Sequence, residues 1–270
     1  MNFWTQNEKN IYVAAHRGWS ERYPENTLIA FASAIGLGVD QLELDIRVSR
    51  DNQFVIIHDE RVDRTTNGEG RVCDFTLSEL KALDAGIHKG EEFEGERIPT
   101  LIELMELIKS HPTLTLDIEL KEYPTDTGKE KIAYEVCDRV IEIIEEYSFG
   151  DRVVINSFSN PLNEYVFKKY SGKYRQHVYY PIQELCGPMT IDPYSYAYCA
   201  CMFKTTDGPV NIASPAEFAS MRALGPQPWA GASVKDELGV DLAILAGASL
   251  ITCNNPDFVL RLLCEKGYHK

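Results

Sequence analysis

The feature of this sequence that most constrains its fold is a regular alternation between short apolar extended segments and longer segments of helical period. The extended segments fall at about residues 11–16, 41–48, 53–59, 113–121, 153–158, 175–181, 198–203, 228–233 and 250–255. Helical segments fall between most of them, at about residues 25–36, 101–110, 129–147, 161–170, 214–225, 234–248 and 256–266. Such an alternation is typical of parallel strands joined by helices. About eight units over roughly 250 residues predict the α/β class and a closed TIM (β/α)8 barrel, with an open doubly wound sheet as the alternative.

Residues 60–98 interrupt the alternation. They contain the turn-forming run RTTNGEG, a short helical segment at residues 76–83 and the charged run HKGEEFEGER. We therefore expect a small insertion, or lid, after the extended segment that ends in His58 and Asp59. Because the sequence contains neither a low-complexity linker nor an internal repeat, residues 1–270 are expected to form a single domain, with the insertion at about 60–98.

The net charge and the cysteine content limit the classes of binding partner and the cellular compartment that we expect for this protein. The formal net charge of −14 makes nucleic acid a poor partner, and a small phosphorylated substrate requires cations gathered at its site. The seven cysteines are odd in number and form no CxxC, so they predict free core thiols and a cytoplasmic protein. The polar start of the chain argues against a signal peptide, and no apolar run approaches the roughly 20 residues of a membrane span, so no stable membrane insertion is expected. The oligomeric state is not indicated.

Two of the predicted strands place acidic residues on their inner face, because alternate side chains of a strand point to opposite sides. In residues 41–48 the leucines and isoleucine share one face and Glu43 and Asp45 share the other. In residues 113–121 the same alternation turns Asp117, Glu119 and Lys121 inward. Burying several carboxylates is costly unless a positive charge offsets the cost. Glu43, Asp45 and Glu119 therefore predict a site for a hard dication, Mg²⁺ or Ca²⁺.

Two further strand ends carry basic side chains. The first strand ends at His16 and Arg17, and the run at residues 53–59 ends at His58 and Asp59. The carboxyl ends of all barrel strands meet at one face, so these residues are expected beside the acidic cluster. Since imidazole titrates near neutral pH, His16 and His58 are candidates for an acid and base pair. Arg17 and Lys121 are candidates to hold a phosphate group.

An ordered set of short fragments then resembles a known family. The fragments are HRG at 16–18, PENT at 24–27, ELD at 43–45, HD at 58–59, IPTLIEL at 98–104 and DIELK at 117–121. Over about residues 12–122 this order resembles the glycerophosphodiester phosphodiesterases. Beyond residue 122 the similarity is looser and comprises NSF at 156–158, Trp229 and GASLITCNNP at 247–256.

The resemblance implies a TIM-barrel hydrolase that uses a divalent metal to cleave glycerophosphodiesters, small molecules that yield glycerol 3-phosphate and an alcohol. It implies that His16 and His58 act as acid and base, that Arg17 and Lys121 contact the phosphate, and that Trp229 flanks the glycerol. It also implies three metal ligands, Glu43, Asp45 and Glu119. The family often has Trp-Thr-Val-Asn where this chain has WAGA at 229–232, which leaves glycerol recognition open. Two alternatives are a lysophospholipase D-like enzyme of the same barrel group and a phosphate- or metal-binding module without catalysis.

Simpler interpretations apply to the remaining polar residues. Asn26 is expected to cap a helix, while no role is assigned to Glu25. Asp59 is expected to orient His58, and Asp117 to pair with Lys121. Four histidines are expected at the surface, namely His88, His111, His177 and His269. Three cysteines are expected to serve packing, namely Cys199, Cys201 and Cys253.

Overall fold

Residues 10–270 are described by the structure, a computed structural model. The polar N-terminal segment, on which the expectation about a signal peptide depends, lies outside the described residues except for Asn10. Among the described residues, no helix combines the length and the apolar character needed to cross a bilayer.

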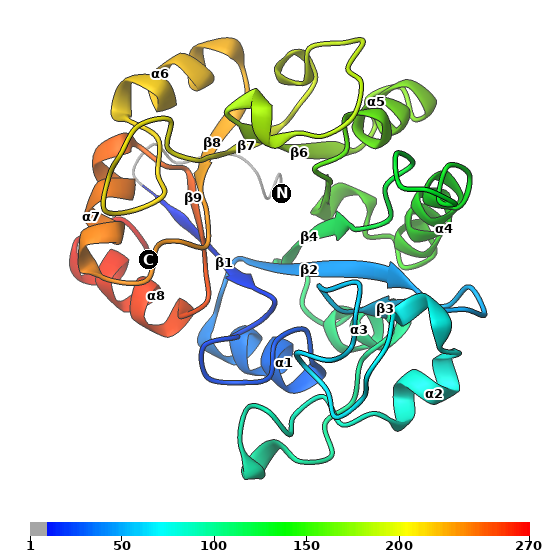
Figure 1. The fold of residues 1–270 in the computed structure, drawn as a ribbon. Coiled ribbons are helices and arrows are strands. Elements are labelled where there is room, and N and C mark those ends of the chain that lie inside the picture. Colours follow the sequence, from blue (N-terminus) through cyan, green and yellow to red (C-terminus); the bar gives the residue numbers. More distant parts are fainter. Residues whose placement is uncertain (1–9) are drawn as a thin grey trace.

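Eight parallel strands close into a barrel, which confirms the predicted TIM fold (Figure 1). The strand order β1-β9-β8-β7-β6-β5-β4-β2 is completed by pairing of β1 with β2, and this closure excludes an open doubly wound sheet. The barrel strands are β1 Tyr12–His16, β2 Gln41–Val48, β4 Thr115–Leu120, β5 Val153–Asn156, β6 Arg175–Tyr180, β7 Cys199–Met202, β8 Gln227–Ala230 and β9 Leu250–Cys253.

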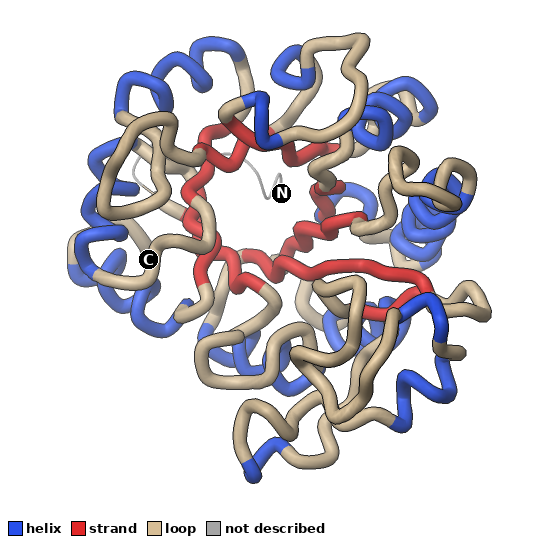
Figure 2. Tube along the Cα trace, viewed as in Figure 1, coloured by secondary structure: helices blue, strands red, loops and turns tan. Residues whose placement is uncertain are grey.

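The helices surround the barrel, with the ring of strands inside them (Figure 2). The outer helices are α1 Leu28–Leu37, α3 Leu101–Ile108, α4 Ile132–Glu146, α5 Asn160–Lys169, α6 Pro215–Leu224, α7 Glu237–Ala246 and α8 Pro256–Glu265. Residues 181–198, all described, join β6 to β7 without an α-helix and contain only the short 3-10 helices η4 Ile182–Glu184 and η5 Pro193–Ser195. The remaining 3-10 helices are η1 Val72–Asp74, η2 Glu91–Phe93 and η3 Gly150–Arg152.

The main core lies between the strands and the helices. Leu42, Leu44 and Ile46 of β2 are fully buried there, as their alternation predicts. Because these side chains point outward to the helices, Glu43 and Asp45 point into the barrel. Burial of each of the three aliphatic side chains contributes about 1.5–3 kcal/mol, and this apolar face thereby fixes the acidic face toward the barrel interior.

One extended segment does not run in the predicted direction. β3, Phe54–Ile56, pairs antiparallel to β2 on the outside of the closed barrel, with Ile46 opposite Ile56. The expectation that residues 53–59 form a strand ending at the common mouth in parallel is therefore wrong. The chain instead turns back after β2, and the Ile57 N–H donates to the Asp45 carbonyl. This return places His58 beside the carboxyl half of β2.

The predicted insertion is confirmed, and it shares a small core with Val55 and Ile57. Residues 60–98 contain α2, Leu77–Ala82, and pack Val62, Val72 and Leu80 in a cluster separate from the main core (cyan in Figure 1). Asp84 organises the following loop, because its carboxylate accepts hydrogen bonds from three main-chain N–H groups, those of Gly86, Ile87 and Gly95. The insertion thus has a packed apolar cluster and a hydrogen-bonded loop, and it lies beside β3.

Candidate active site

The chain leaves β1 through a tight turn that presents His16 and Arg17 at the barrel mouth. Arg17 has a positive φ of 58°, a conformation that side chains other than glycine rarely adopt and that concentrates at functional sites. Gly18 follows with a φ of 79°, and a Cβ there would lie 2.7 Å from the main-chain carbon of Ala30 in α1. The HRG fragment therefore requires its glycine for close packing on α1, and that packing fixes the two basic side chains.

Three carboxylates converge inside the barrel. Glu43 and Asp45 come from β2 and Glu119 from β4, where Asp45 and Glu119 are paired in register. All three are buried, with 4%, 0% and 5% exposure, and one ligand atom of each lies within 4.8 Å of the others. Burial and then the neighbouring Asp45 raise the pKa of Glu43 well above its usual value, and burial likewise raises the pKa of Glu119. The predicted acidic residues therefore form one cluster compatible with a divalent metal.

Positive charges already surround this cluster. Lys121 Nζ lies 2.5 Å from Glu119 Oε1 and 3.1 Å from Asp45 Oδ1, and Arg17 Nε lies 3.3 Å from Asp45 Oδ2. Although burial opposes it, Lys121 and then Arg17 hold the pKa of Asp45 well below its ordinary value. Two oxygens of the cluster thus converge on a single positive charge in this structure.

The expected minor roles near the cluster need two corrections. Asn26 does not cap α1, because Thr27 is the N-cap. Asn26 has a φ of 56° and donates from Nδ2 to Asp45 Oδ2 at 2.8 Å, so it holds the carboxylate in place. Asp117 does not pair with Lys121, since its Oδ2 lies 2.7 Å from His177 Nδ1. The alternation that put Asp117 inside the barrel was right, but its partner comes from β6.

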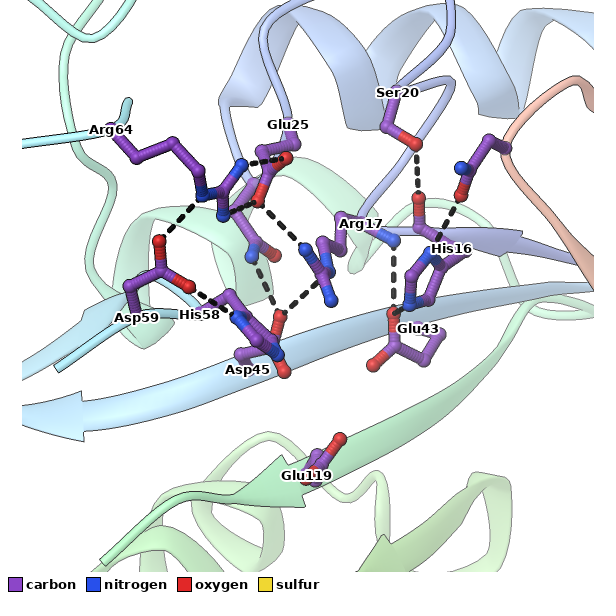
Figure 3. Close-up of polar contacts among 12 residues, drawn as sticks. His16, Arg17, Ser20, Glu25, Glu43, Asp45, His58, Asp59, Arg64 and Glu119 are labelled. Atoms are coloured by element: carbon purple, nitrogen blue, oxygen red, sulfur yellow. Dashed lines mark hydrogen bonds and ion pairs between the residues drawn. The ribbon is translucent and has the colours of Figure 1, made fainter. Parts of the chain in front are cut away.

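The two candidate catalytic histidines lie at opposite ends of the Glu43 and Asp45 pair (Figure 3). His16 Nδ1 lies 2.6 Å from Asn254 Oδ1, while His16 Nε2 lies 3.9 Å from Glu43 Oε2. Burial, together with the Arg17 charge, lowers the pKa of His16 to about 4. Each ring nitrogen of His16 therefore has a defined neighbour, and the ring is neutral at pH 7.

His58 is oriented by the residue that follows it. His58 Nδ1 lies 2.6 Å from Asp59 Oδ1, in the arrangement expected for an orienting carboxylate. The His58 carbonyl also accepts from Arg47 Nε at 2.8 Å. Burial lowers the pKa of the His58 imidazole. His58 is thus held through its main-chain carbonyl and through its Nδ1 atom. Its Nε2 atom is left for other partners.

Sequence reasoning missed three polar side chains that hold this site. Arg64, in the insertion, bonds to both Asp59 and Glu25, and Glu25 in turn accepts from Arg17 at 2.9 Å. Asn254 follows β9 and holds His16. The sequence analysis assigns no role to Arg64, whose one signal is its position five residues after Asp59. Asn254 carried a signal too, because it ends a barrel strand.

A cavity of about 240 Å³ opens beside these residues. Its lining includes the charged or titratable side chains of His16, Arg17, Glu43, His58, Glu119 and Lys121. It also includes aromatic side chains, since Phe158 and Tyr179 stack with centroids 3.5 Å apart and Phe203 follows Tyr179 at 5.7 Å. Asp45 does not line the cavity itself but contacts two residues that do, Arg17 and Lys121. The cavity therefore joins all the predicted acidic and basic residues at one place.

Trp229 and His177 occupy places other than those expected. Trp229 is only 2% exposed and does not line the cavity. It packs edge-on against His177 with centroids 5.0 Å apart, so it has a packing role inside the barrel, and its contact with the glycerol stays a prediction. His177 is not a surface residue, because it lies inside the barrel on β6 and lines the cavity.

The remaining histidines and the packing cysteines follow the expectation in part. His88 is exposed as predicted and His111 is half-buried. His269 is not a surface side chain, because it is only 9% exposed and forms an ion pair with Asp40. All seven cysteines are free, and Cys199, Cys201 and Cys253 are buried. Cys201 also lines the cavity.

Comparison with known proteins places this site in context. The sequence profile of the glycerophosphoryl diester phosphodiesterase family matches residues 16–193. A glycerophosphodiester phosphodiesterase from Caldanaerobacter subterraneus subsp. tengcongensis is 50% identical over 152 residues, which cover 55% of this chain and 58% of that protein. Glycerophosphodiester phosphodiesterase 1 of Homo sapiens is 35% identical over 162 residues, covering 56% and 49% of the two chains. The matched part thus spans about half the length of these curated relatives.

The fold is shared with solved structures. A phosphodiesterase from Oleispira antarctica, solved in complex with the product sn-glycerol-3-phosphate, superposes with a TM-score of 0.77 at 24% identity. The superposition covers 94% of this chain and 96% of that one. At this identity the likeness concerns the barrel as a whole.

Proposed function

The chain belongs to the glycerophosphoryl diester phosphodiesterase family, and from this premise we propose that it hydrolyses glycerophosphodiesters to glycerol 3-phosphate and an alcohol. One observation carries the proposal. Two imidazoles, a guanidinium and a cluster of three buried carboxylates meet at a single cavity, although they come from β1, β2, β4 and the segment after β3. Each group alone is common in proteins, whereas their convergence supplies every charge that a phosphodiester cleavage needs.

A divalent metal fits the carboxylate cluster. Glu43, Asp45 and Glu119 would hold it, because their donors are all oxygens and lie within 4.8 Å of one another, a set that suits Mg²⁺ or Ca²⁺. The ammonium of Lys121 between Asp45 and Glu119 indicates that a positive charge is favoured at this position. A bound dication would supply charge to offset the negative phosphoryl oxygens.

The side chains of this chain would divide the remaining work. Arg17 lines the cavity with a guanidinium whose fork of donors suits two phosphate oxygens. Lys121 contributes a second cation near the same oxygens. In-line displacement at phosphorus places the attacking and leaving oxygens on opposite sides. His16 and His58, at opposite ends of the acidic pair, suit removal of a proton from the attacking hydroxyl and donation of a proton to the leaving oxygen.

Two further assignments accompany this proposal. We propose that residues 1–270 act as one domain, because among residues 10–270 the outer helices surround one barrel and the insertion packs against β3. The protein is cytoplasmic, which is in keeping with its seven free cysteines.

The proposal is tested by the release of glycerol 3-phosphate. Purified protein is incubated with glycerophosphocholine, glycerophosphoethanolamine and glycerophosphoglycerol, in the presence of EDTA or after Mg²⁺ or Ca²⁺ is restored. We expect release from at least one substrate that EDTA abolishes and one of the two metals restores. Absence of metal-dependent release from all three substrates would favour a binding module without catalysis.

A further inference from the structure

A histidine and a carboxylate lie beside an exposed cysteine, at the end of the barrel opposite the cavity. Of the seven free cysteines, all of them described by the structure, four are buried, two are half-buried and Cys264 is exposed. Cys264 Sγ lies 4.0 Å from His269 Nδ1, and the other ring nitrogen, Nε2, lies 3.0 Å from Asp40 Oδ2. Asp40 directly precedes β2, so this group lies at the amino ends of the strands, whereas the candidate active site lies at their carboxyl ends.

The turn after α8 places His269 over Cys264. Gly267 has a φ of 78°, its N–H donates to the Cys264 carbonyl at 3.1 Å, and the Tyr268 N–H donates at 2.8 Å to the carbonyl of the residue before Cys264. These two bonds and the left-handed glycine form a Schellman motif, which turns the chain back over the last turn of a helix. The Tyr268 carbonyl then accepts from the Ile11 N–H at 2.7 Å. The approach of His269 to Cys264 is therefore fixed by hydrogen bonds of the main chain.

Asp40 and His269 are arranged as an orienting acid and a base. A carboxylate on Nε2 selects the tautomer with its hydrogen on that atom, so Nδ1 keeps its lone pair toward the thiol. The hydrogen bond to Asp40 raises the pKa of His269, against the opposing effect of burial, so the ring accepts a proton readily near neutral pH. A nucleophile, a base within reach of it and an acid that orients the base form the arrangement that activates a thiol.

The charges around Cys264 decide whether its thiol can ionise. Cys264 lies in the last turn of α8, where the roughly half negative charge of the helix end opposes a thiolate. An imidazolium at His269 carries a full positive charge 4.0 Å from Sγ, which outweighs the helix end. Tyr12 of β1 stays neutral, because burial and the Asp40 charge raise its pKa, and α1, which packs against α8, holds no titratable residue. The charged side chains on or beside the last turn are paired with one another, namely Glu265 with Arg261, and Lys266 with Glu237 and Asp241.

We propose that Cys264 is a reactive thiol that exchanges with small dissolved disulfides, with His269 as its base and Asp40 as the residue that positions the base. The proton of Sγ passes to His269 Nδ1, and the thiolate attacks one sulfur of the disulfide RSSR. A bond forms between Sγ and that sulfur while the S–S bond of the reagent breaks, and the released thiolate takes the proton from His269 and leaves as RSH. The product is a reversible mixed disulfide on Cys264. Because this residue is exposed, a dissolved reagent reaches it without a binding pocket, and the inference is independent of the proposed function.

The test measures how fast Cys264 reacts with bis(2-hydroxyethyl) disulfide, a small neutral reagent that the net charge of −14 neither attracts nor repels. Peptide mass spectrometry after an acid quench gives the extent of reaction at each cysteine. At pH 7 we expect Cys264 in the folded protein to react about tenfold faster or more than the same residue in urea-unfolded protein, because a neighbouring imidazole raises the fraction of thiolate. His269→Asn should slow the folded protein by about tenfold or more. Asp40→Asn should slow it by less, since the base remains but loses the charge that orients it.

Two controls separate activation of the thiol from loss of structure. His111→Asn, which removes a half-buried histidine in the loop before β4, is the matched control and keeps the natural rate. At pH 9.5 the natural protein and His269→Asn should react at similar rates, because a thiol ionises there without help. Fraying of the turn after α8 would expose the sulfur further and speed the reaction, so slower reaction of His269→Asn reports the lost base.

Two results overturn the inference. One is a His269→Asn variant that reacts at pH 7 as fast as the natural protein. The other is a folded natural protein whose Cys264 reacts no faster than the same residue in the unfolded chain. The second comparison needs no variant, so it decides the matter even where His269→Asn does not fold.

Discussion

Arg64 of the insertion donates hydrogen bonds to both carboxylate oxygens of Glu25, with Nη1 2.9 Å from Oε2 and Nη2 2.8 Å from Oε1 (Figure 3). The third guanidinium nitrogen, Nε, donates to Asp59 at 2.5 Å. Glu25 accepts from Arg17, and Asp59 bonds to His58. A single side chain from outside the barrel is thus linked to Arg17 through Glu25 and to His58 through Asp59.

We predict that Arg64→Ala lowers kcat/KM for glycerophosphocholine by about 10- to 100-fold, because small displacements of positioned groups carry costs of that size. Without the Arg64 guanidinium, Glu25 loses two hydrogen bonds and competes with the phosphate for Arg17. Asp59 is left with His58 as its only side-chain partner in this network. Arg64→Lys keeps the charge but not the planar fork, so we expect only partial recovery. Steady-state kinetics with both variants measures the effect.

The matched control is Arg61→Ala. Arg61 lies in the same insertion and forms an exposed ion pair with Asp63, and exposed pairs of this kind contribute little to stability. We expect its kinetics to match those of the natural protein. Unchanged kinetics in Arg64→Ala would show that the insertion does not position the site.

The sequence was sufficient for the barrel and for the acidic cluster. The period of two in β2 and β4 assigns an inner and an outer face without any knowledge of neighbours, and closure of the barrel then brings Glu43, Asp45 and Glu119 together. The position of the HRG turn was predicted for a similar reason, because the carboxyl ends of all barrel strands lie at the same face of the barrel.

The parts that were wrong depended on partners in space. Nothing in a three-residue strand such as β3 specifies that it runs antiparallel to β2. His177 stands in the run RQHVYY, which has no clear alternation, so its inward orientation was hidden. Trp229 lies in β8 and is 2% exposed, a burial that its sequence context did not indicate. Its depth below the mouth depends on the stagger between strands, which a single sequence does not encode.

A second prediction concerns the two histidines. His16→Ala and His58→Ala should each lower kcat by about 10²–10⁴-fold, the usual contribution of a positioned proton carrier, with little change in the melting temperature. A substrate with p-nitrophenol as its alcohol separates the roles, because that leaving group needs no proton. The variant that lacks the general acid should regain most of its rate on this substrate. Near-normal turnover of glycerophosphocholine by both variants would reject the pair.

The carboxylate cluster leads to a third prediction. Mg²⁺ or Ca²⁺ at about 100 times its Kd should stabilise the protein by about 2.7 kcal/mol, which raises the melting temperature by about 5 °C. Glu43→Gln should remove this rise. In metal-free protein at pH 8 the same variant should melt about 2 °C higher than the natural protein, because burial and Asp45 raise the pKa of Glu43 and the neutral amide avoids that charge.

Differential scanning fluorimetry of EDTA-treated protein measures both effects. Glu265→Gln serves as the control, since Glu265 pairs with Arg261 on the exposed face of α8 and should leave the metal response intact. A full metal response in Glu43→Gln would place the cation elsewhere.

The last prediction concerns the ion pair between His269 and Asp40, far from the acidic cluster. His269 Nε2 lies 3.0 Å from Asp40 Oδ2, which also accepts from the Val13 N–H of β1 at 2.8 Å. The hydrogen bond to Asp40 raises the pKa of His269, against the opposing effect of burial. Because the folded pKa lies above the unfolded value of about 6.5, the stabilisation is complete below that pH and is lost as the pH rises through the folded pKa.

We therefore expect His269→Asn to lower the free energy of unfolding by about 1 kcal/mol at pH 5.5 and by clearly less at pH 8.5. Urea unfolding of the natural protein and the variant at both pH values gives the two differences, in which the titration of all other groups cancels. Asp40→Asn keeps an oxygen acceptor for Val13 but removes the charge, so it should reproduce the pH dependence, whereas His111→Ala should show none. A difference that grows from pH 5.5 to pH 8.5 would mean that His269 is favoured in its neutral form and that the pair with Asp40 does not stabilise the folded chain.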